Sequence, residues 1–123
     1  MGMQRDMDLI RQILFKVEAH PEGFAPREIQ IDGDYTASQI GYHVWLLGDE
    51  GLMKVADVTS SGSSGPQAIP LNLTSKGHDF IDSARNDTIW SHAKAKAKSV
   101  GGSLSVAMFQ QLLNSLVKSQ LGM

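Results

Sequence analysis

The sequence predicts a small α+β fold, and two stretches carry this prediction. Ile40 to Met53 has the pattern of a short amphipathic helix that ends at Gly51 and leads directly into a strand. Leu71 to Ile81 has the pattern of a strand followed by Thr74, which can cap the next helix. A helix, a pair of strands and a closing helix in this order are typical of the winged-helix fold.

Composition limits the functions that the chain can have. Its 123 residues, 41% of them hydrophobic, suit one compact domain, and the formal charge of −2 gives no general attraction to nucleic acid. Cysteine is absent, so we expect neither disulfides nor a cysteine-based zinc site, and a reducing cytoplasmic location. We expect no secretory signal in the acidic start of the sequence and no contact with a membrane, since no apolar run is long enough to span one.

The first part of the chain predicts a helix, a short strand and a second helix. Apolar residues at three- and four-residue spacing between Asp6 and His20 predict the first helix, which Pro21 should end. The alternation in residues 28–31 predicts a short strand, and residues 32–34 predict a turn. Thr36 or Ser38 can cap the second helix. Its expected buried face consists of Ile40, Val44 and Leu47.

Residues 53–58 and 68–73 predict the two strands of a wing. The connection between them, residues 59–66, is rich in serine and glycine, and we expect a flexible tip. Residues 74–84 predict the closing helix. We therefore expect a winged-helix domain over residues 1–85.

Residues 86–123 predict a C-terminal extension of two helices. Residues 86–88 offer a cap for a helix over residues 89–99, and Ser103 or Ser105 can begin the last helix. The last helix carries an apolar stripe that is too large to leave in water. Either it packs back on the domain or it forms the seam of a homodimer. Its members are Val106, Phe109, Leu112, Leu113, Leu116 and Val117.

Residues 36–81 resemble the winged-helix half of bacterial ArsR-like and MarR-like regulators. In those proteins the pattern His-Leu-x-x-Leu-x-x-x-Gly-Leu ends the recognition helix, and here residues 43–52 read His-Val-Trp-Leu-Leu-Gly-Asp-Glu-Gly-Leu. The helix that normally precedes the recognition helix is missing. The resemblance implies a recognition-type helix that lies in the major groove of DNA.

Residues 3–121 are also similar to a phage- and prophage-encoded family of unknown function. The similarity lies in five motifs that occur in order, namely residues 5–11, 40–43, 73–80, 87–90 and 102–105. It implies a phage or prophage origin and a cytoplasmic role in the host bacterium, and it implies no activity. The chain departs from this family most in residues 59–66.

One hypothesis is a DNA-associated regulator. Ser38, Gln39 and Tyr42 would face the groove, and Lys54 on the wing and Lys94 on the extension would contact phosphates. Against this hypothesis, no lysine or arginine occurs from residue 32 to residue 52, and the acidic residues there repel the DNA backbone. Lys94 is followed by two more lysines at two-residue spacing, which spreads them around a helix.

The alternative hypothesis is a module that binds a host protein, such as a defence or replication factor. Tyr42 and Trp45 lie three residues apart and would form an aromatic patch, unless Trp45 packs under the wing or against the last helix. The second candidate surface is part of the C-terminal stripe, namely Phe109, Leu112, Leu113 and Leu116.

We expect no catalysis, no metal and no cofactor. The four histidines have no metal-ligand spacing, and we expect His43 to form hydrogen bonds within the fold. Asp79 and Asp82 precede Arg85, which predicts a surface ion pair. The sequence thus predicts a cytoplasmic, homodimeric winged-helix protein that acts by binding.

Overall fold

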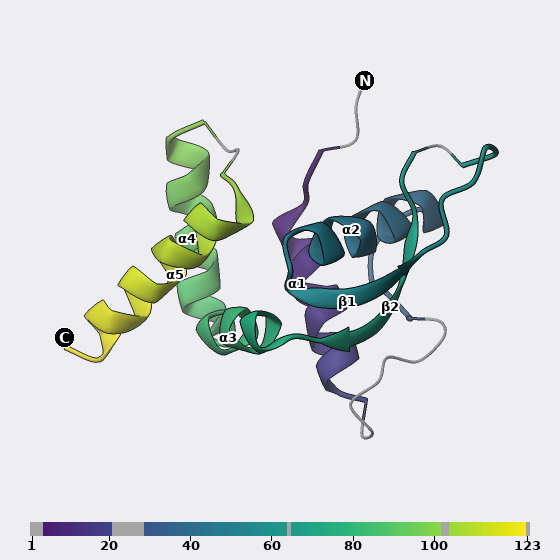
Figure 1. Cartoon of the computed structure of the whole chain (residues 1–123). Helices are drawn as coiled ribbons and strands as arrows, with labels where there is room; N and C mark the ends of the chain where they lie inside the picture. The colour runs from purple at the N-terminus through teal and green to yellow at the C-terminus, as the bar shows by residue number, and fades with distance from the viewer. Residues whose placement is uncertain (1–3, 21–28, 64, 102–103, 123) are drawn as a thin grey trace. The chain divides into compact units, whose positions relative to one another are not determined.

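The computed structural model describes residues 4–20, 29–63, 65–101 and 104–122, which form five helices and one antiparallel sheet of two strands (Figure 1). This confirms a mixed α+β fold. The contacts divide the chain into two compact units, residues 1–78 and residues 79–123. The division falls within helix α3 (Ser75–Ser83), ahead of the boundary that the sequence suggested at residue 85. Each unit is described by itself below.

Helix α1 (Met7–Glu18) supplies one complete face of the core of the first unit. Asp6 caps it, because the Asp6 Oδ1 atom accepts a hydrogen bond from the Leu9 backbone N–H at 3.1 Å. Each apolar side chain on the inner face contributes about 1.5–3 kcal/mol when it is buried. The inner face consists of Leu9, Ile10, Ile13, Leu14 and Val17, none of which is more than 2% exposed.

The sequence predicts a short strand over residues 28–31. This prediction is wrong for residues 29–31, which the structure describes and which have no strand pairing. Residue 28 lies outside the described residues, as does the predicted helix break at Pro21. The side chain of Gln12 pairs with the backbone of Asp32 instead: its Nε2 donates to the Asp32 carbonyl at 3.0 Å, and its Oε1 accepts from the Asp32 N–H. A side chain from α1 therefore holds the backbone directly after these residues.

Helix α2 (Ala37–Asp49) begins with a capping box. The Thr36 hydroxyl accepts from the Gln39 N–H at 3.1 Å, and the Gln39 side chain accepts from the Thr36 N–H at 2.8 Å. The helix ends before Gly51, whose φ of +78° is a conformation that favours glycine. Val44 and Leu47 are buried as expected, and Ile40 is half-buried.

Strands β1 (Met53–Asp57) and β2 (Ala68–Leu73) confirm the predicted hairpin. Met53 pairs with Leu73 and Asp57 with Ala68, and a shift in register between Lys54 and Val55 produces a bulge. Pro70, opposite Val55, cannot donate a backbone hydrogen bond.

Helix α2 lies along this hairpin (Figure 1). A Cβ atom on Gly48 would lie 2.4 Å from the Val55 Cγ2 atom. A Cβ atom on Gly41 would lie 2.0 Å from the Oε1 atom of Gln67. The Nε2 atom of the same side chain donates a hydrogen bond to the Ser38 carbonyl at 3.0 Å. The two glycines, seven residues apart, thus form the side of α2 that faces the sheet.

The sequence predicts a flexible tip between the strands, but hydrogen bonds hold the base of this connection. The Thr59 hydroxyl donates to the Gln67 carbonyl at 3.3 Å and accepts from the Gln67 N–H at 2.9 Å. Nearer the tip, the Ser60 N–H donates to the Ser63 hydroxyl at 3.0 Å. Ser64 lies outside the described residues.

His43 joins α2 to the start of α1. Its Nδ1 donates to the Gln39 carbonyl at 2.7 Å, and its Nε2 accepts from the Asp6 backbone N–H at 2.9 Å. These two partners require a neutral ring with its proton on Nδ1. The ring is only 1% exposed, and burial lowers the pKa of His43. The expectation that His43 forms hydrogen bonds within the fold is confirmed.

The start of α3 is held against the end of α2. The Thr74 hydroxyl donates to the Gly51 carbonyl at 2.6 Å and accepts from the Gly77 N–H at 3.1 Å. Lys76 donates to the Glu50 carbonyl at 3.0 Å. A Cβ atom on Gly77 would lie 2.0 Å from the carbonyl oxygen of Leu52, so the helix can approach this backbone only with glycine at residue 77.

The second unit has an aromatic core. Its helices are α4 (Asp87–Ser99), capped by Asn86, and α5 (Val106–Gln120), capped by Ser105. The Trp90 ring contacts Phe80 at 6.5 Å and Phe109 at 5.0 Å between ring centroids, both edge-on. Ser103, the other predicted cap, lies outside the described residues.

We predict that Gly77→Ala lowers the stability of the chain, although alanine is normally the better helix residue by up to about 1 kcal/mol. Overpacking against the Leu52 carbonyl should cost about 1–3 kcal/mol in the free energy of unfolding, measured by urea denaturation. Gly62→Ala is the control, since a Cβ atom there would have no atom nearer than Ser60 Oγ at 4.0 Å. A Gly77→Ala chain as stable as the wild type would contradict the close approach.

The neutral His43 ring predicts a pH dependence of stability. The folded-state pKa lies below the unfolded value of about 6.5, so the unfolded chain takes up the proton first as the pH falls. The free energy of unfolding should therefore decrease as the pH falls from 7 through about 6.5 towards 5. In His43→Gln this decrease should be smaller, whereas the exposed control His92→Gln should keep it. Equal pH profiles for His43→Gln and the wild type would refute this role of His43.

Candidate functional site

The outward face of α2 carries two stacked aromatic rings. Ser38, Tyr42, Trp45 and Asp49 follow one another at spacings of four, three and four residues, which places them on one side of the helix. The Tyr42 and Trp45 rings lie 6.1 Å apart between centroids with 10° between their planes. Both rings are half-buried, and Asp49 at the end of the face is exposed.

An exposed carboxylate, Asp57, lies beside this aromatic pair. It is the last residue of β1, and its Oδ1 atom accepts from the Thr59 N–H at 2.8 Å. Hydrogen bonds from the side chain and the backbone of Thr59 lower the pKa of Asp57, and the nearby Trp45 side chain contributes least to this effect. The carboxylate therefore stays ionised next to the indole ring. We call Tyr42, Trp45, Asp49 and Asp57 the aromatic–acidic patch.

Of the residues predicted to read DNA, Gln39 and Tyr42 use their side chains within the fold, and Ser38 uses its backbone carbonyl. The Gln39 side chain is part of the capping box, and the Ser38 carbonyl accepts from Gln67. Tyr42 stacks on Trp45. The structure thus brings Ser38, Gln39 and Tyr42 together on α2, as expected, but only part of each remains accessible.

The two predicted phosphate contacts belong to different units. Lys54 is exposed on β1 in the first unit, and Lys94 is exposed on α4 in the second. Residues 1–78 contain six basic and ten acidic residues, a formal charge of −4. Residues 79–123 contain five basic and three acidic residues, a charge of +2. The unit that holds α2 is therefore the acidic one.

The C-terminal stripe divides into a buried and a half-buried part. Phe109 and Leu113 were predicted as interface residues, but they are at most 1% exposed and belong to the core. The reason is that α5 packs on α4, where Phe109 contacts Trp90. Leu112 and Leu116 are half-buried. Of the candidate residues on this helix, only these two remain partly accessible.

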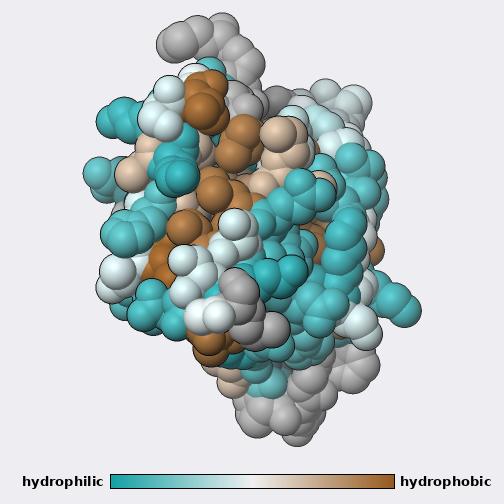
Figure 2. All heavy atoms as spheres, turned by 90° about the vertical axis from the view of Figure 1, so that its left-hand side faces the viewer, coloured by the Kyte–Doolittle hydropathy of each residue, from teal (hydrophilic) through white to brown (hydrophobic). Residues whose placement is uncertain are grey.

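The surface of the second unit has exposed apolar side chains of its own. Figure 2, which views the molecule from the side where α4 and α5 lie in Figure 1, shows brown side chains in a band bordered by teal ones. The most exposed large apolar residues of this unit are Val100, Met108 and Leu121, at 74%, 55% and 68%.

Asp82 and Arg85 form the predicted ion pair at 3.1 Å.

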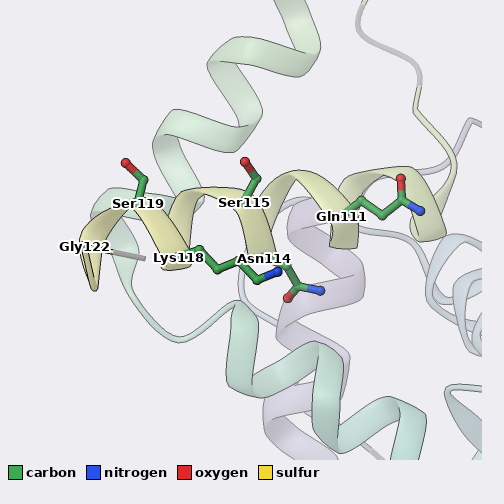
Figure 3. A pocket seen from close by; sticks show the side chains of 6 residues that line it. All are labelled: Gln111, Asn114, Ser115, Lys118, Ser119 and Gly122. Carbon is green, nitrogen blue, oxygen red and sulfur yellow. The ribbon is translucent and has the colours of Figure 1, made fainter.

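Two hollows differ in character. In the first unit, an apolar groove of about 380 Å³ lies between the first half of α2 and the start of β2, and its lining includes Ile29, Ala37, Ile40, Val44, Val58 and Ile69. In the second unit, a polar hollow of about 610 Å³ runs along α5 (Figure 3). Its only charged group is Lys118. The groove suits an apolar side chain, and the polar hollow offers no pair of groups for acid–base chemistry.

Among the residues that the structure describes, no three histidine or acidic side chains are grouped so that they could hold a metal ion. The same residues include no helix that is long and apolar enough to cross a membrane.

Sequence reasoning missed Asp57, which belongs to the patch, and Gln67, which contacts α2. Asp57 had a local signal, since aspartate two residues before threonine often forms a turn through its side chain. No local signal could predict that Asp57 lies near Trp45, because the two are twelve positions apart in the chain. Gln67 likewise meets α2 only through the tertiary fold.

The chain is similar to proteins of unknown function. Residues 4–103 match the family described as "Hypothetical protein (DUF2513)". An uncharacterised protein of Haemophilus influenzae is 33% identical over 121 residues, which cover 97% of this chain and 99% of that protein. No solved structure matches the chain. The similarity thus extends over both units.

We predict that Phe109→Ala and Met108→Ala, which change neighbouring residues of α5, differ greatly in effect. Phe109→Ala should lower the free energy of unfolding by about 3–5 kcal/mol, because it leaves a cavity beside Trp90. Met108→Ala, at a side chain that is 55% exposed, should change it by less than about 0.5 kcal/mol. Thermal and urea unfolding would measure both, and similar losses would show that Phe109 is not in the core.

Proposed function

The chain belongs to the family described as "Hypothetical protein (DUF2513)", and we propose that within this family of unknown function it is a non-enzymatic winged-helix protein that binds a basic segment of a host protein. The order of α1, α2, β1, β2 and the start of α3 in the first unit supports the winged-helix assignment. The five sequence motifs support a phage or prophage origin and action in the host cytoplasm. A bacterial relative is consistent with this setting.

The observation that carries the proposal is the aromatic–acidic patch. In a winged helix that reads DNA, the outward face of the corresponding helix carries cationic and amide side chains towards bases and phosphates. Here that face carries two stacked rings, the exposed Asp49 and, beside Trp45, the ionised Asp57. A lysine or arginine side chain can stack on an aromatic ring and pair with a carboxylate at the same time.

The charge of the first unit supports the same partner. Its formal charge of −4 attracts a basic segment over longer range and repels the phosphate backbone. The apolar groove beside α2 offers space for an apolar side chain of the same segment. Aromatic side chains in partly buried positions are common anchors of protein interfaces.

DNA binding is the outcome that would replace this proposal. The lysines that could contact phosphates, Lys94, Lys96 and Lys98, are exposed on α4, and residues 88–123 contain no acidic residue. If the chain bound DNA, these lysines and not α2 would provide the contacts. The two hypotheses therefore depend on different residues.

We predict that the chain binds a fluorescein-labelled arginine-rich peptide in an anisotropy titration and not a matched acidic peptide. Trp45→Ala should weaken binding of the basic peptide by about 2- to 30-fold, as expected for the loss of a cation–π contact. Asp57→Asn should also weaken it, because the substitution removes the charge and keeps the shape. Asp82→Asn, an exposed carboxylate of the second unit, is the control that should not.

A mixed-sequence DNA duplex in the same titration provides the opposing result. Salt-sensitive binding of the duplex that is lost in Lys94→Ala and Lys98→Ala, without binding of the peptide, would overturn the proposal in favour of a DNA-associated protein. Binding of the peptide that is unchanged in Trp45→Ala and Asp57→Asn would place the contact elsewhere and would reject the patch.

A further inference from the structure

Asp6 is hydrogen-bonded at three points at the start of α1. Its backbone N–H donates to the His43 Nε2 atom at 2.9 Å. Its carboxylate accepts at Oδ1 from the Leu9 N–H at 3.1 Å and at Oδ2 from the Tyr35 hydroxyl at 3.2 Å. One residue therefore joins the first turn of α1 to α2 and to the segment that precedes α2.

The His43 ring has no free position for a second proton. Its Nδ1 atom already donates to the Gln39 carbonyl at 2.7 Å, so an added proton must bind to Nε2. There it would face the Asp6 N–H, which is also a donor. Water cannot separate the two donors unless the site rearranges, because the ring is only 1% exposed. Uptake of a proton therefore breaks the bond between His43 and the Asp6 backbone.

The groups around the ring identify the acceptor that can replace this bond. Burial has the largest effect and lowers the pKa of His43, the Gln39 carbonyl and then the Asp6 carboxylate raise it, and Arg5 lowers it. The Tyr42 ring meets His43 edge-on at 6.0 Å between centroids. Of these groups, Asp6 is the one with a negative charge, and its own backbone already contacts Nε2.

We propose that His43 is a proton switch for the start of α1. When Nε2 takes up a proton from solvent, it leaves the Asp6 N–H and donates to the Asp6 carboxylate. The carboxylate turns from α1 towards the ring, and so it releases the Leu9 N–H and the Tyr35 hydroxyl. One proton thus exchanges three hydrogen bonds for one between opposite charges. The first turn of α1 loses its cap, and Tyr35 loses its link to α1.

The rearrangement is confined to this end of α1. The rest of the inner face, from Ile10 to Val17, is at most 2% exposed and stays in the core in both states. Burial, the Asp6 carboxylate and Asp8 raise the pKa of Tyr35, so its hydroxyl keeps its proton in acid. A pH dependence of stability applies to any buried neutral histidine, whereas the switch requires a change within the folded chain.

An NMR titration of the full chain from neutral to acidic pH tests the switch. The His43 ring, the Asp6 and Leu9 amides and the Tyr35 ring should shift with one common midpoint, which lies below the ordinary histidine pKa of 6.5. The Ile13 amide, in the middle of α1, should keep its folded position through this midpoint. Its position reports that the core remains intact while the start of the helix changes.

Two variants separate the switch from a general effect of acid. In His43→Gln the shifts of Leu9 and Tyr35 at the wild-type midpoint should be lost, whereas His92→Gln, at an exposed histidine of α4, is the control that should keep them. Asp6→Asn retains a side chain that can cap α1 but carries no charge. In this variant the Leu9 amide should no longer follow His43, and the His43 midpoint should fall. Asp6→Asn also provides the test if His43→Gln does not fold.

Three results would overturn the proposal. The first is a titration of His43 that leaves the Leu9 and Tyr35 signals in place. The second is a set of Leu9 and Tyr35 shifts that persists in His43→Gln at the wild-type midpoint. The third is the loss of the folded Ile13 signal together with the Leu9 shift, because the chain would then unfold as a whole instead of switching locally.

Discussion

The architecture of the first unit depends on how closely α2 approaches the hairpin. A Cβ atom on Gly48 would overlap the Val55 side chain, and one on Gly41 would displace the end of the Gln67 side chain, so this side of α2 faces the hairpin and its connection. Once it does so, the helical period turns Val44 and Leu47 into the core and Tyr42 towards solvent. The same placement brings Trp45 to the end of β1, where Asp57 lies. The aromatic–acidic patch is therefore a consequence of backbone proximity and not of a separate motif.

Much of the fold could be predicted because its signals are local. Helices α1 and α2 are visible in their apolar spacing, and caps such as Asn86 and Ser105 lie directly before the helices that they begin. The strand expected over residues 28–31 had an equally good local pattern. It fails because a strand needs a partner, and residues 29–31 have no strand pairing in the part of the chain that the structure describes. Local alternation cannot report whether a partner strand is present.

The candidate surfaces were harder to predict than the elements that carry them. Six apolar residues of α5 lie on one side of the helix, and periodicity alone does not say which of them are buried most deeply. Contact with Trp90 selects Phe109 for the core, and Leu112, three residues later, lies at the edge of the buried side. Trp45 and Asp57 meet only because two elements pack together. Residue types could be predicted in each case, whereas their grouping depends on the tertiary structure.

The bulge in the hairpin has a consequence for the behaviour of the chain at high concentration. A two-stranded sheet has two open edges, and an open edge invites strands of other molecules to add to it, the first step towards amyloid-like aggregates. Here Pro70 lacks a donor and the register shift next to it interrupts the ladder, although Ile69 and Leu71 are exposed on either side. The irregularity makes β2 a poor template, so the hairpin can keep apolar side chains at its surface without recruiting further strands.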